Sequence, residues 1–154
     1  MIALLQRVGN ARVEVDHVSI GAIEAGLLVF VAIERGDDYA QAKRLLERIL
    51  TYRVFADSRG RMNLSLAATG GGLLLVPQFT LAADTHKGTR ASFAAAASPK
   101  QGQLLFNDLI KESRKQHARV ETGRFGANMQ VHLVNDGPVT FWLRAPPSRP
   151  TPLI

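Results

Sequence analysis

Apolar residues in the first part of the chain are spaced for β-structure. Residues 2–15 predict one strand, or two strands joined near Gly9 and Asn10, and residues 18–24 can pair with them as a hairpin. Residues 26–34, GLLVFVAIE, form an apolar run, which is typical of a strand buried on both faces. This part of the chain therefore predicts a hairpin followed by a central strand.

Two later segments have the period of an α-helix instead. Apolar residues recur at helical spacing across residues 39–53, and Asp37 and Asp38 precede them, where negative charge stabilises a helix. A second helix is predicted from the N-cap Ser98, with Pro99 in its first turn and basic residues near its C-terminus. Two main helices are therefore expected.

The segments around these helices predict a turn and further strands. Residues 57–65 are expected to form a turn, and residues 70–77 a buried strand that ends at a proline. Two late strands are predicted around residues 119–122 and 130–134, and a further strand-like segment runs through Leu143. Alternating strands and helices predict a mixed α/β fold with one strand-rich face.

The stretch VNDGPVTFWL is unusual for a turn between strands. Strand-like residues flank Asn135-Asp136-Gly137-Pro138 on both sides, as they would in a hairpin. A simple turn would need only the first three of these residues. Proline has no N–H and restricts the residue before it, so the Gly-Pro pair calls for a separate explanation.

Composition supports one packed domain. The chain has 154 residues, of which 46% are hydrophobic. We expect a domain over residues 1–145 and a loose tail over residues 146–154, which contains four of the seven prolines. No apolar run approaches the roughly 20 residues that span a bilayer, and no signal peptide is recognisable. The absence of cysteine excludes disulfides and thiol catalysis and fits a cytoplasmic protein.

The net charge of +6 favours a polyanionic partner, RNA or DNA first. The alternative is that the positive charge only keeps the protein soluble, because the basic residues are scattered. Only residues 84–90, DTHKGTR, and residues 111–119, KESRKQHAR, are locally enriched in them. No block resembles a basic tail.

No metal site or cofactor loop is predicted. The histidines lie far apart, without a second histidine or a carboxylate at metal-binding helix spacing. Three glycines at 70–72 precede a strand rather than a helix, so they do not form a phosphate-binding loop. No G-x-S-x-G nucleophile motif is present. The four histidines are His17, His86, His117 and His132.

The segment PQFTLAADTHKGTRASF is a candidate site for ester chemistry. Pro77 cannot donate to a strand ladder, so pairing is expected to stop there. Gln78, Phe79 and Thr80 follow it, and backbone N–H groups freed near a strand end could stabilise a developing oxyanion. Thr80 also offers a hydroxyl and Gln78 an amide. The alternative is a strand followed by an ordinary loop.

At these residues the chain resembles the D-aminoacyl-tRNA deacylases, also called D-tyrosyl-tRNA deacylases. The two family motifs, S-Q-F-T and N-x-G-P-V-T, are represented by PQFT at 77–80 and NDGPVT at 135–140. Supporting matches are LLQRV, RVFADSRGRMNLS, FTLAADTHKG and VETGRFGANM, all in order from Met1 to about Leu143. The main departure is Pro77 in place of the usual serine.

The resemblance implies a homodimeric enzyme with a three-layer ββα fold, mixed β-sheets and two main helices. Such enzymes hydrolyse the ester between a D-amino acid, or glycine, and the terminal ribose of tRNA, and so proofread chirality in translation. They need no cofactor, and their partners are aminoacyl-tRNA and a second copy of the chain, not a membrane. Which D-aminoacyl-tRNAs matter most in the cell stays open.

The resemblance also implies roles for single residues. Gly137 and Pro138 correspond to a cis Gly-Pro pair that reaches into the active site of the other subunit and excludes L-amino acids. Arg7 corresponds to the arginine that braces this loop. Met129 lies where the family has a wall of its substrate pocket.

Three further residues correspond to the reaction centre of the family. Phe79 and Thr80 match the residues whose N–H groups face the scissile carbonyl, and Gln78 matches a pocket-lining residue. Thr80 as a nucleophile is an alternative, but no base adjoins it in sequence. We favour a backbone role, with the ribose 2′-hydroxyl assisting water.

Two other functions remain as alternatives. One is a non-catalytic RNA-binding module, against which the chain has only one Trp and two Tyr. The other is an enzyme of this fold that removes L-alanine from mischarged tRNA. The resemblance implies that such a relative lacks the bracing arginine, so Arg7 argues against it.

Overall fold

The structure is a computed structural model that describes residues 1–146. The strands are β1 (Ile2–Val15), β2 (Val18–Ile23), β3 (Gly26–Ala32), β4 (Phe55–Ala56), β5 (Met62–Leu64), β6 (Gly72–Pro77), β7 (Val120–Thr122) and β8 (Gln130–Arg144). The helices are α1 (Tyr39–Thr51), α2 (Leu66–Thr69), the 3-10 helix η1 (Phe79–Ala82) and α3 (Pro99–Gln116). The predicted tail lies almost wholly outside the described residues.

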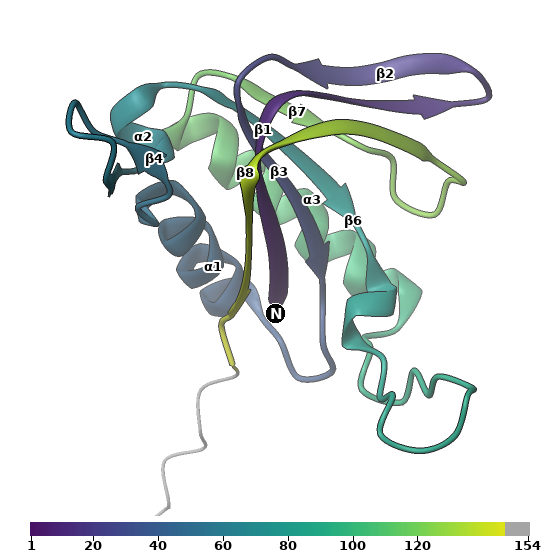
Figure 1. The fold of residues 1–154 in the computed structure, drawn as a ribbon. Helices are drawn as coiled ribbons and strands as arrows, with labels where there is room; N and C mark the ends of the chain where they lie inside the picture. Colours follow the sequence, from purple (N-terminus) through teal and green to yellow (C-terminus); the bar gives the residue numbers. More distant parts are fainter. Residues whose placement is uncertain (147–154) are drawn as a thin grey trace, which may run out of the picture.

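One six-stranded sheet organises the fold, in the order β2-β1-β3-β6-β7 with β8 on the other edge of β1. The β3–β6 and β6–β7 pairs are parallel and the other pairs are antiparallel. Along β1, one edge pairs first with β3 and then with β2, while the other edge pairs with β8. Figure 1 shows the upper parts of β1 and β8 turning away from their lower parts, with β2 beside the upper part of β1.

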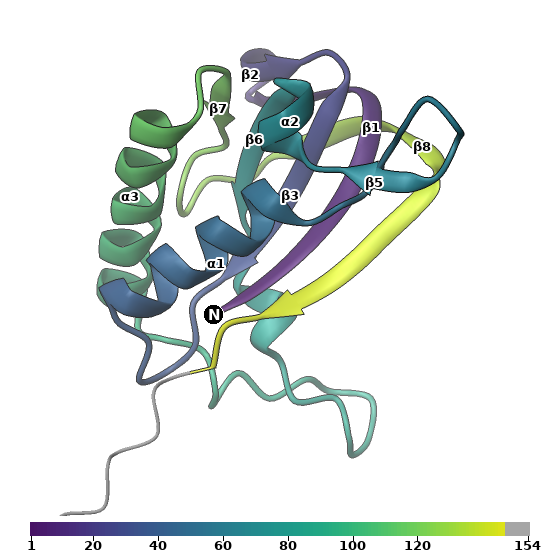
Figure 2. The ribbon, with the colours of Figure 1, turned by 90° about the vertical axis from the view of Figure 1, so that its left-hand side faces the viewer.

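This curvature produces three layers, as the resemblance implies. Figure 2 shows α1 and α3 on one side of the sheet. The larger core lies between these helices and the sheet, and includes Leu5, Leu45 and Phe106. A second core lies on the opposite face, where Val13, Leu74 and their neighbours are covered by the curled strands. The mixed α/β ββα class is therefore confirmed.

Both main helices begin where the sequence predicts, because polar side chains cap them. Asp38 and Gln41 form a reciprocal capping box at the start of α1. Ser98 caps α3, and Pro99 occupies its first turn. No helix in the described part of the chain is both long and apolar enough to cross a membrane.

Two local predictions were wrong. The segment at 57–65 contains more than a turn, because β4 and β5 pair as a small hairpin around it and α2 follows. The two late strand segments expected from residue 130 onwards form the single strand β8. Pairing with β1 on both sides of the Gly-Pro pair makes one strand of them.

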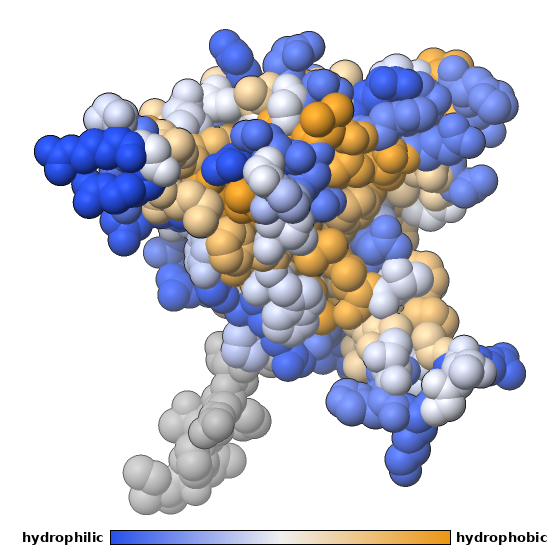
Figure 3. Space-filling view, in the orientation of Figure 1, coloured by the Kyte–Doolittle hydropathy of each residue, from blue (hydrophilic) through white to orange (hydrophobic). Residues whose placement is uncertain are grey.

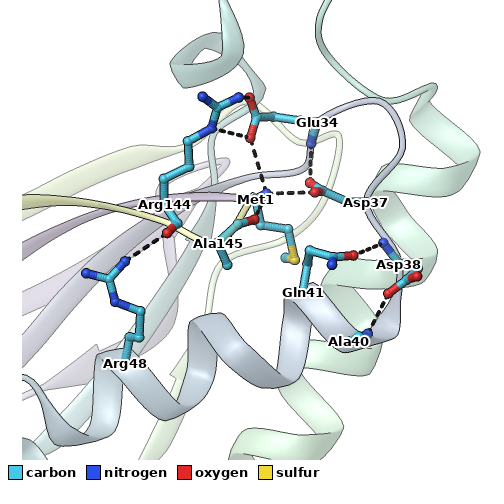
Figure 4. Close-up of polar contacts among 9 residues, drawn as sticks. All are labelled: Met1, Glu34, Asp37, Asp38, Ala40, Gln41, Arg48, Arg144 and Ala145. Atoms are coloured by element: carbon cyan, nitrogen blue, oxygen red, sulfur yellow. Dashed lines mark hydrogen bonds and ion pairs between the residues drawn. The ribbon is translucent and has the colours of Figure 1, made fainter. Parts of the chain in front are cut away.

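A buried ionic cluster joins the start of β1 to the end of β8 (Figure 4). The α-amino group of Met1 donates to Asp37 at 2.8 Å, to Glu34 at 3.2 Å and to the carbonyl of Ala145 at 2.8 Å. Arg144 donates to Glu34 at 2.6 and 3.1 Å. The cluster therefore holds the first and last strands beside the loop that leads into α1.

The two carboxyl groups respond differently to this site. Burial raises the pKa of Asp37, despite its bond to the amine. Burial acts in the same direction on Glu34, but hydrogen bonds from Arg144 and the Met1 amine outweigh it and lower its pKa. A lowered pKa means that Glu34 stabilises the fold above about pH 4.3 and loses this effect as the pH falls through its folded pKa. For Asp37 the effect is reversed: because its pKa is raised, its ionisation lowers the stability of the fold.

We predict that Asp37→Ala lowers the free energy of unfolding by about 3 kcal/mol, because it leaves a buried ammonium group short of a partner. Urea denaturation followed by circular dichroism measures this loss. Glu24→Ala is the control, since Glu24 is exposed, and should change stability by less than about 0.5 kcal/mol. Equal stability of the two variants would show that the amine does not depend on Asp37.

Candidate active site

The β6 strand ends in a way that leaves two backbone N–H groups free. Pro77 pairs with Val31 in the parallel ladder, and the Gln78 N–H donates to the Val31 carbonyl at 2.7 Å. The chain then turns into η1, whose first bond runs from Leu81 N–H to Gln78 O. The N–H groups of the first helical residues have no acceptor within such a turn. Phe79 and Thr80 N–H find none elsewhere in the described residues.

The side chains at this turn contact one another or the loop that follows. Phe79 is 58% exposed and packs its ring against Phe93, with ring centroids 5.1 Å apart. The Gln78 amide donates to the Thr80 hydroxyl. Gln78 is the only hydrogen-bond partner of that hydroxyl among residues 1–146. No general base therefore adjoins Thr80 within the described chain.

A cavity of about 460 Å³ opens beside this turn. Its walls are mostly apolar and come from the ends of β3 and β6, from the start of α3 and from the segment before β8. Gln78, Phe79 and Met129 line it, whereas Thr80 does not. The lining residues are Val31, Ile33, Val76, Pro77, Gln78, Phe79, Ala97, Ser98, Pro99, Gly102, Phe125, Gly126, Ala127, Met129 and Val131.

Two glycines allow the cavity walls to pack closely. A Cβ on Gly123 would lie 2.8 Å from the sulfur of Met129, and one on Gly102 would lie 3.2 Å from the ring of Phe125. Sequence reasoning found Met129 but missed Phe125 and the start of α3 as walls of the site. The only signal for Phe125 was its place in VETGRFGANM.

The Gly-Pro pair forms a protrusion on β8. Gln6 pairs with Thr140 and Val8 pairs with Asn135, so the residues between them leave the ladder. The Gly137–Pro138 bond is cis, as expected from the resemblance, and Gly137 has φ +128°. A Cβ there would lie 2.7 Å from Val139 and 3.0 Å from Arg7, so no other residue fits without strain.

Arg7 and Asn135 hold this protrusion in place. Arg7 Nε lies 3.2 Å from the Asp136 carbonyl and 3.1 Å from its carboxylate. Arg7 also donates to the Val54 carbonyl at 2.7 Å. The Asn135 amide donates to the carbonyls of Arg7 and Val139, at 3.3 and 3.1 Å. Arg7 therefore ties the loop to Val54, and Asn135 ties it to the backbone of β1 and to Val139.

One chain does not bring the loop and the cavity together. Gly137 lies on β8 near the level of Arg7, whereas Gln78 follows β6, level with Val31. Strand spacing and rise place these positions roughly 15–20 Å apart. Within residues 1–146, no group of His, Asp and Glu side chains is arranged to hold a metal ion.

The loop after η1 carries several charged residues. Asp84 accepts from the backbone N–H of His86 at 3.0 Å and lies 2.6 Å from its ring nitrogen Nδ1. These two hydrogen bonds lower the pKa of Asp84. Lys87 and Arg90, from the same loop, are exposed to solvent.

Known proteins resemble this chain over almost its full length. The family model for D-Tyr-tRNA(Tyr) deacylase matches residues 4–144. A D-aminoacyl-tRNA deacylase of Alkalilimnicola ehrlichii is 64% identical and covers 96% of this chain and 99% of its own. One of Methylococcus capsulatus is 63% identical, with 97% and 98% covered.

Solved structures agree on the fold. The c-Myc DNA unwinding element binding protein is 36% identical, with a TM-score of 0.91, and covers 95% of this chain and 99% of its own. A probable eukaryotic D-amino acid tRNA deacylase has a TM-score of 0.75 at 18% identity, with 92% and 97% covered. At that identity the second likeness concerns the fold alone.

The family model and the named relatives define the class of this protein as a hydrolase that acts on ester bonds. The chain belongs to the D-Tyr-tRNA(Tyr) deacylase family, and its function is that of a D-aminoacyl-tRNA deacylase.

We predict that Arg7→Met loosens the loop, because it removes the contacts to Asp136 and leaves the Val54 carbonyl without its donor. Hydrogen exchange should become at least about tenfold faster for the amides of residues 135–140 other than Pro138, which corresponds to about 1.4 kcal/mol. Arg12→Met is the control, because the Arg12 side chain, on the same strand, bonds only to the side chain of Glu14 among the described residues. Unchanged exchange in Arg7→Met would show that the loop does not need this brace.

Proposed function

We propose that the chain hydrolyses the ester between a D-amino acid, or glycine, and the 3′-terminal ribose of tRNA, and that the Gly137–Pro138 loop of a second subunit rejects L-amino acids. The observation that carries this proposal is the pair of N–H groups on Phe79, which lines the cavity, and on the adjacent Thr80, neither of which has an acceptor among residues 1–146. Such a pair matches the needs of an oxyanion that forms during ester cleavage.

The chemistry requires little from the side chains. Water adds to the ester carbonyl, and the two N–H groups stabilise the oxyanion that develops on its oxygen. The bond to the ribose oxygen then breaks, and that oxygen takes a proton. Because the Thr80 hydroxyl contacts only Gln78 among the described residues, the ribose 2′-hydroxyl assists the water. The protein positions the ester and aligns its donors in advance.

The cavity suits the terminal nucleoside of the tRNA. Its volume of about 460 Å³ lies in the range of small-molecule sites. Unstacked bases commonly pack on aromatic rings, and Phe125 offers one in the wall. The aminoacyl ester would then lie at the rim, beside Gln78 and Phe79.

A chiral filter cannot depend on affinity for the side chain, because D- and L-amino acids carry the same one. It needs a fixed wall that clashes with one enantiomer. The loop at Gly137 is suited to this, since Arg7 and Asn135 hold its backbone. In one chain it lies too far from Gln78, so a partner must supply it.

The face opposite the helices offers a surface for that partner. Trp142, Leu4 and Phe30 lie side by side on β8, β1 and β3, and Trp142 is 53% exposed. Figure 3 shows hydrophobic residues gathered across the middle of this face. An exposed apolar sheet face of this kind is typical of an interface between copies.

The proposal is tested by hydrolysis of matched D-Tyr-tRNA and L-Tyr-tRNA by the purified protein. We expect rapid release of D-tyrosine, little release of L-tyrosine, and no loss of activity with a chelator. Comparable rates on both esters would refute the chiral filter. Release of L-alanine from tRNA in place of D-tyrosine would favour the alternative editing function, and tRNA binding without hydrolysis would favour an RNA-binding module.

Two substitutions at Thr80 distinguish the role of its backbone N–H from the role of its hydroxyl. Thr80→Ala keeps the N–H, so its kcat should stay within about tenfold of the wild type. Thr80→Pro removes one oxyanion donor and should lower kcat by about 10²–10³-fold. Single-turnover kinetics on D-Tyr-tRNA measures both. If Thr80→Ala is folded but as inactive as Thr80→Pro, the hydroxyl is the reacting group.

We predict that Trp142→Glu yields an inactive monomer, because it places a charge in the proposed interface. Sedimentation velocity and D-Tyr-tRNA hydrolysis measure the two effects. Leu104→Glu is the control, since Leu104 is equally exposed on α3, and it should leave the dimer intact. A monomeric variant with full activity would show that one chain suffices.

A further inference from the structure

A groove rich in arginine runs along the exposed side of α1. It consists of two adjoining hollows of about 540 and 500 Å³, which share Arg44 and Arg48. Arg53 lines the first hollow and Arg144 lines the second. Figure 2 shows α1 on the outside of the molecule, with the β4–β5 hairpin near its C-terminal end.

The groove has more positive than negative charge. Arg44 pairs with Glu47 at 2.6 Å, and Arg144 pairs with Glu34 at 2.6 Å. Arg48 and Arg53 have no carboxylate within ion-pair distance in the described part of the chain. Glu47 is the only carboxylate among the lining residues of the two hollows.

The guanidinium of Arg48 is also held in position. It donates to the Arg144 carbonyl at 2.8 Å and lies over the Tyr52 ring, 5.9 Å from its centroid. An arginine that is already ordered loses less entropy on binding a phosphate, and its planar donors fit phosphate oxygens in pairs. Arg44 lies one helical turn away, about 6 Å along the axis.

The groove ends beside the protruding loop of the same chain. Arg53 is followed by Val54, whose carbonyl accepts from Arg7, and Arg7 in turn holds Asp136. Whatever binds at Gly137 and Pro138 is therefore close to the end of the groove. In the proposed dimer this loop meets the 3′ end of the tRNA held by the partner.

We propose that this groove binds the sugar-phosphate backbone near the acceptor end of the tRNA substrate. The subunit that supplies the chiral wall then also supplies the main phosphate contacts. This proposal rests on the proposed function for the identity of the RNA. The net charge of +6 and the excess of arginine in the groove match a polyanion.

The test compares two double variants that each remove two positive charges. Arg44→Gln with Arg53→Gln alters the groove, whereas Lys111→Gln with Arg114→Gln alters exposed positions on α3. Affinity for uncharged tRNA is measured from about 50 to 300 mM KCl, within the range where counterion release is visible. The kcat and KM for D-Tyr-tRNA are measured beside it.

We expect the groove variant to bind tRNA about tenfold more weakly at low salt and to lower the salt slope by about two. Its KM should rise similarly, with kcat within twofold of the wild type. The α3 variant should stay within about twofold in affinity. Replacing Arg44 and Arg53 by Lys, which keeps the charge, should restore most of the binding.

Equal losses in the groove and α3 variants, or no loss in the groove variant, would overturn the proposal. The binding arm does not require hydrolysis, so it decides the role of the groove even if D-Tyr-tRNA is not cleaved. Conversely, rapid D-specific hydrolysis with unchanged tRNA binding by the groove variant would refute the role of the groove and leave the proposed function intact.

Discussion

Hydrogen bonding along both edges of β1 determines where most other parts of this fold lie. A step of two positions on β1, from Gln6 to Val8, is matched by a step of five on β8, from Thr140 to Asn135. Because pairing resumes on both sides, the surplus residues must leave the ladder. The protrusion at Gly137 and Pro138 is thus a consequence of register, and a mobile loop is not needed to form it.

The same strand carries the brace of that protrusion. Arg7 lies between the two registered pairs, so its side chain reaches Asp136 on one side and Val54 on the other. The proposed oxyanion donors depend on a different constraint. Strand β6 ends at Pro77, and after the tight turn that follows, the N–H groups of Phe79 and Thr80 have no acceptor within residues 1–146. Two separate departures from regular pairing therefore supply the two halves of the proposed site.

Local sequence patterns predicted the features that depend on residues close together in the chain. The helix starts at Asp38 and Ser98 are capping signals, and the apolar runs of β3 and β6 follow from burial. The sequence did not reveal that β8 is continuous, because that depends on β1 as a partner. It also did not reveal the Met1 cluster or Phe125 in the cavity wall, since these contacts join residues distant in the chain. The Gly-Pro pair and the PQFT segment stood out because of their prolines, and the resemblance then supplied their expected roles.

The composite site is tested most directly by a crystal structure with a non-hydrolysable D-tyrosyl adenosine analogue. The carbonyl oxygen of the ligand should lie about 2.7–3.1 Å from the N–H nitrogens of Phe79 and Thr80 in one subunit. Its amino group should contact the backbone at Gly137 and Pro138 of a second subunit. A ligand held by one chain alone, or one whose carbonyl lies away from η1, would contradict this arrangement.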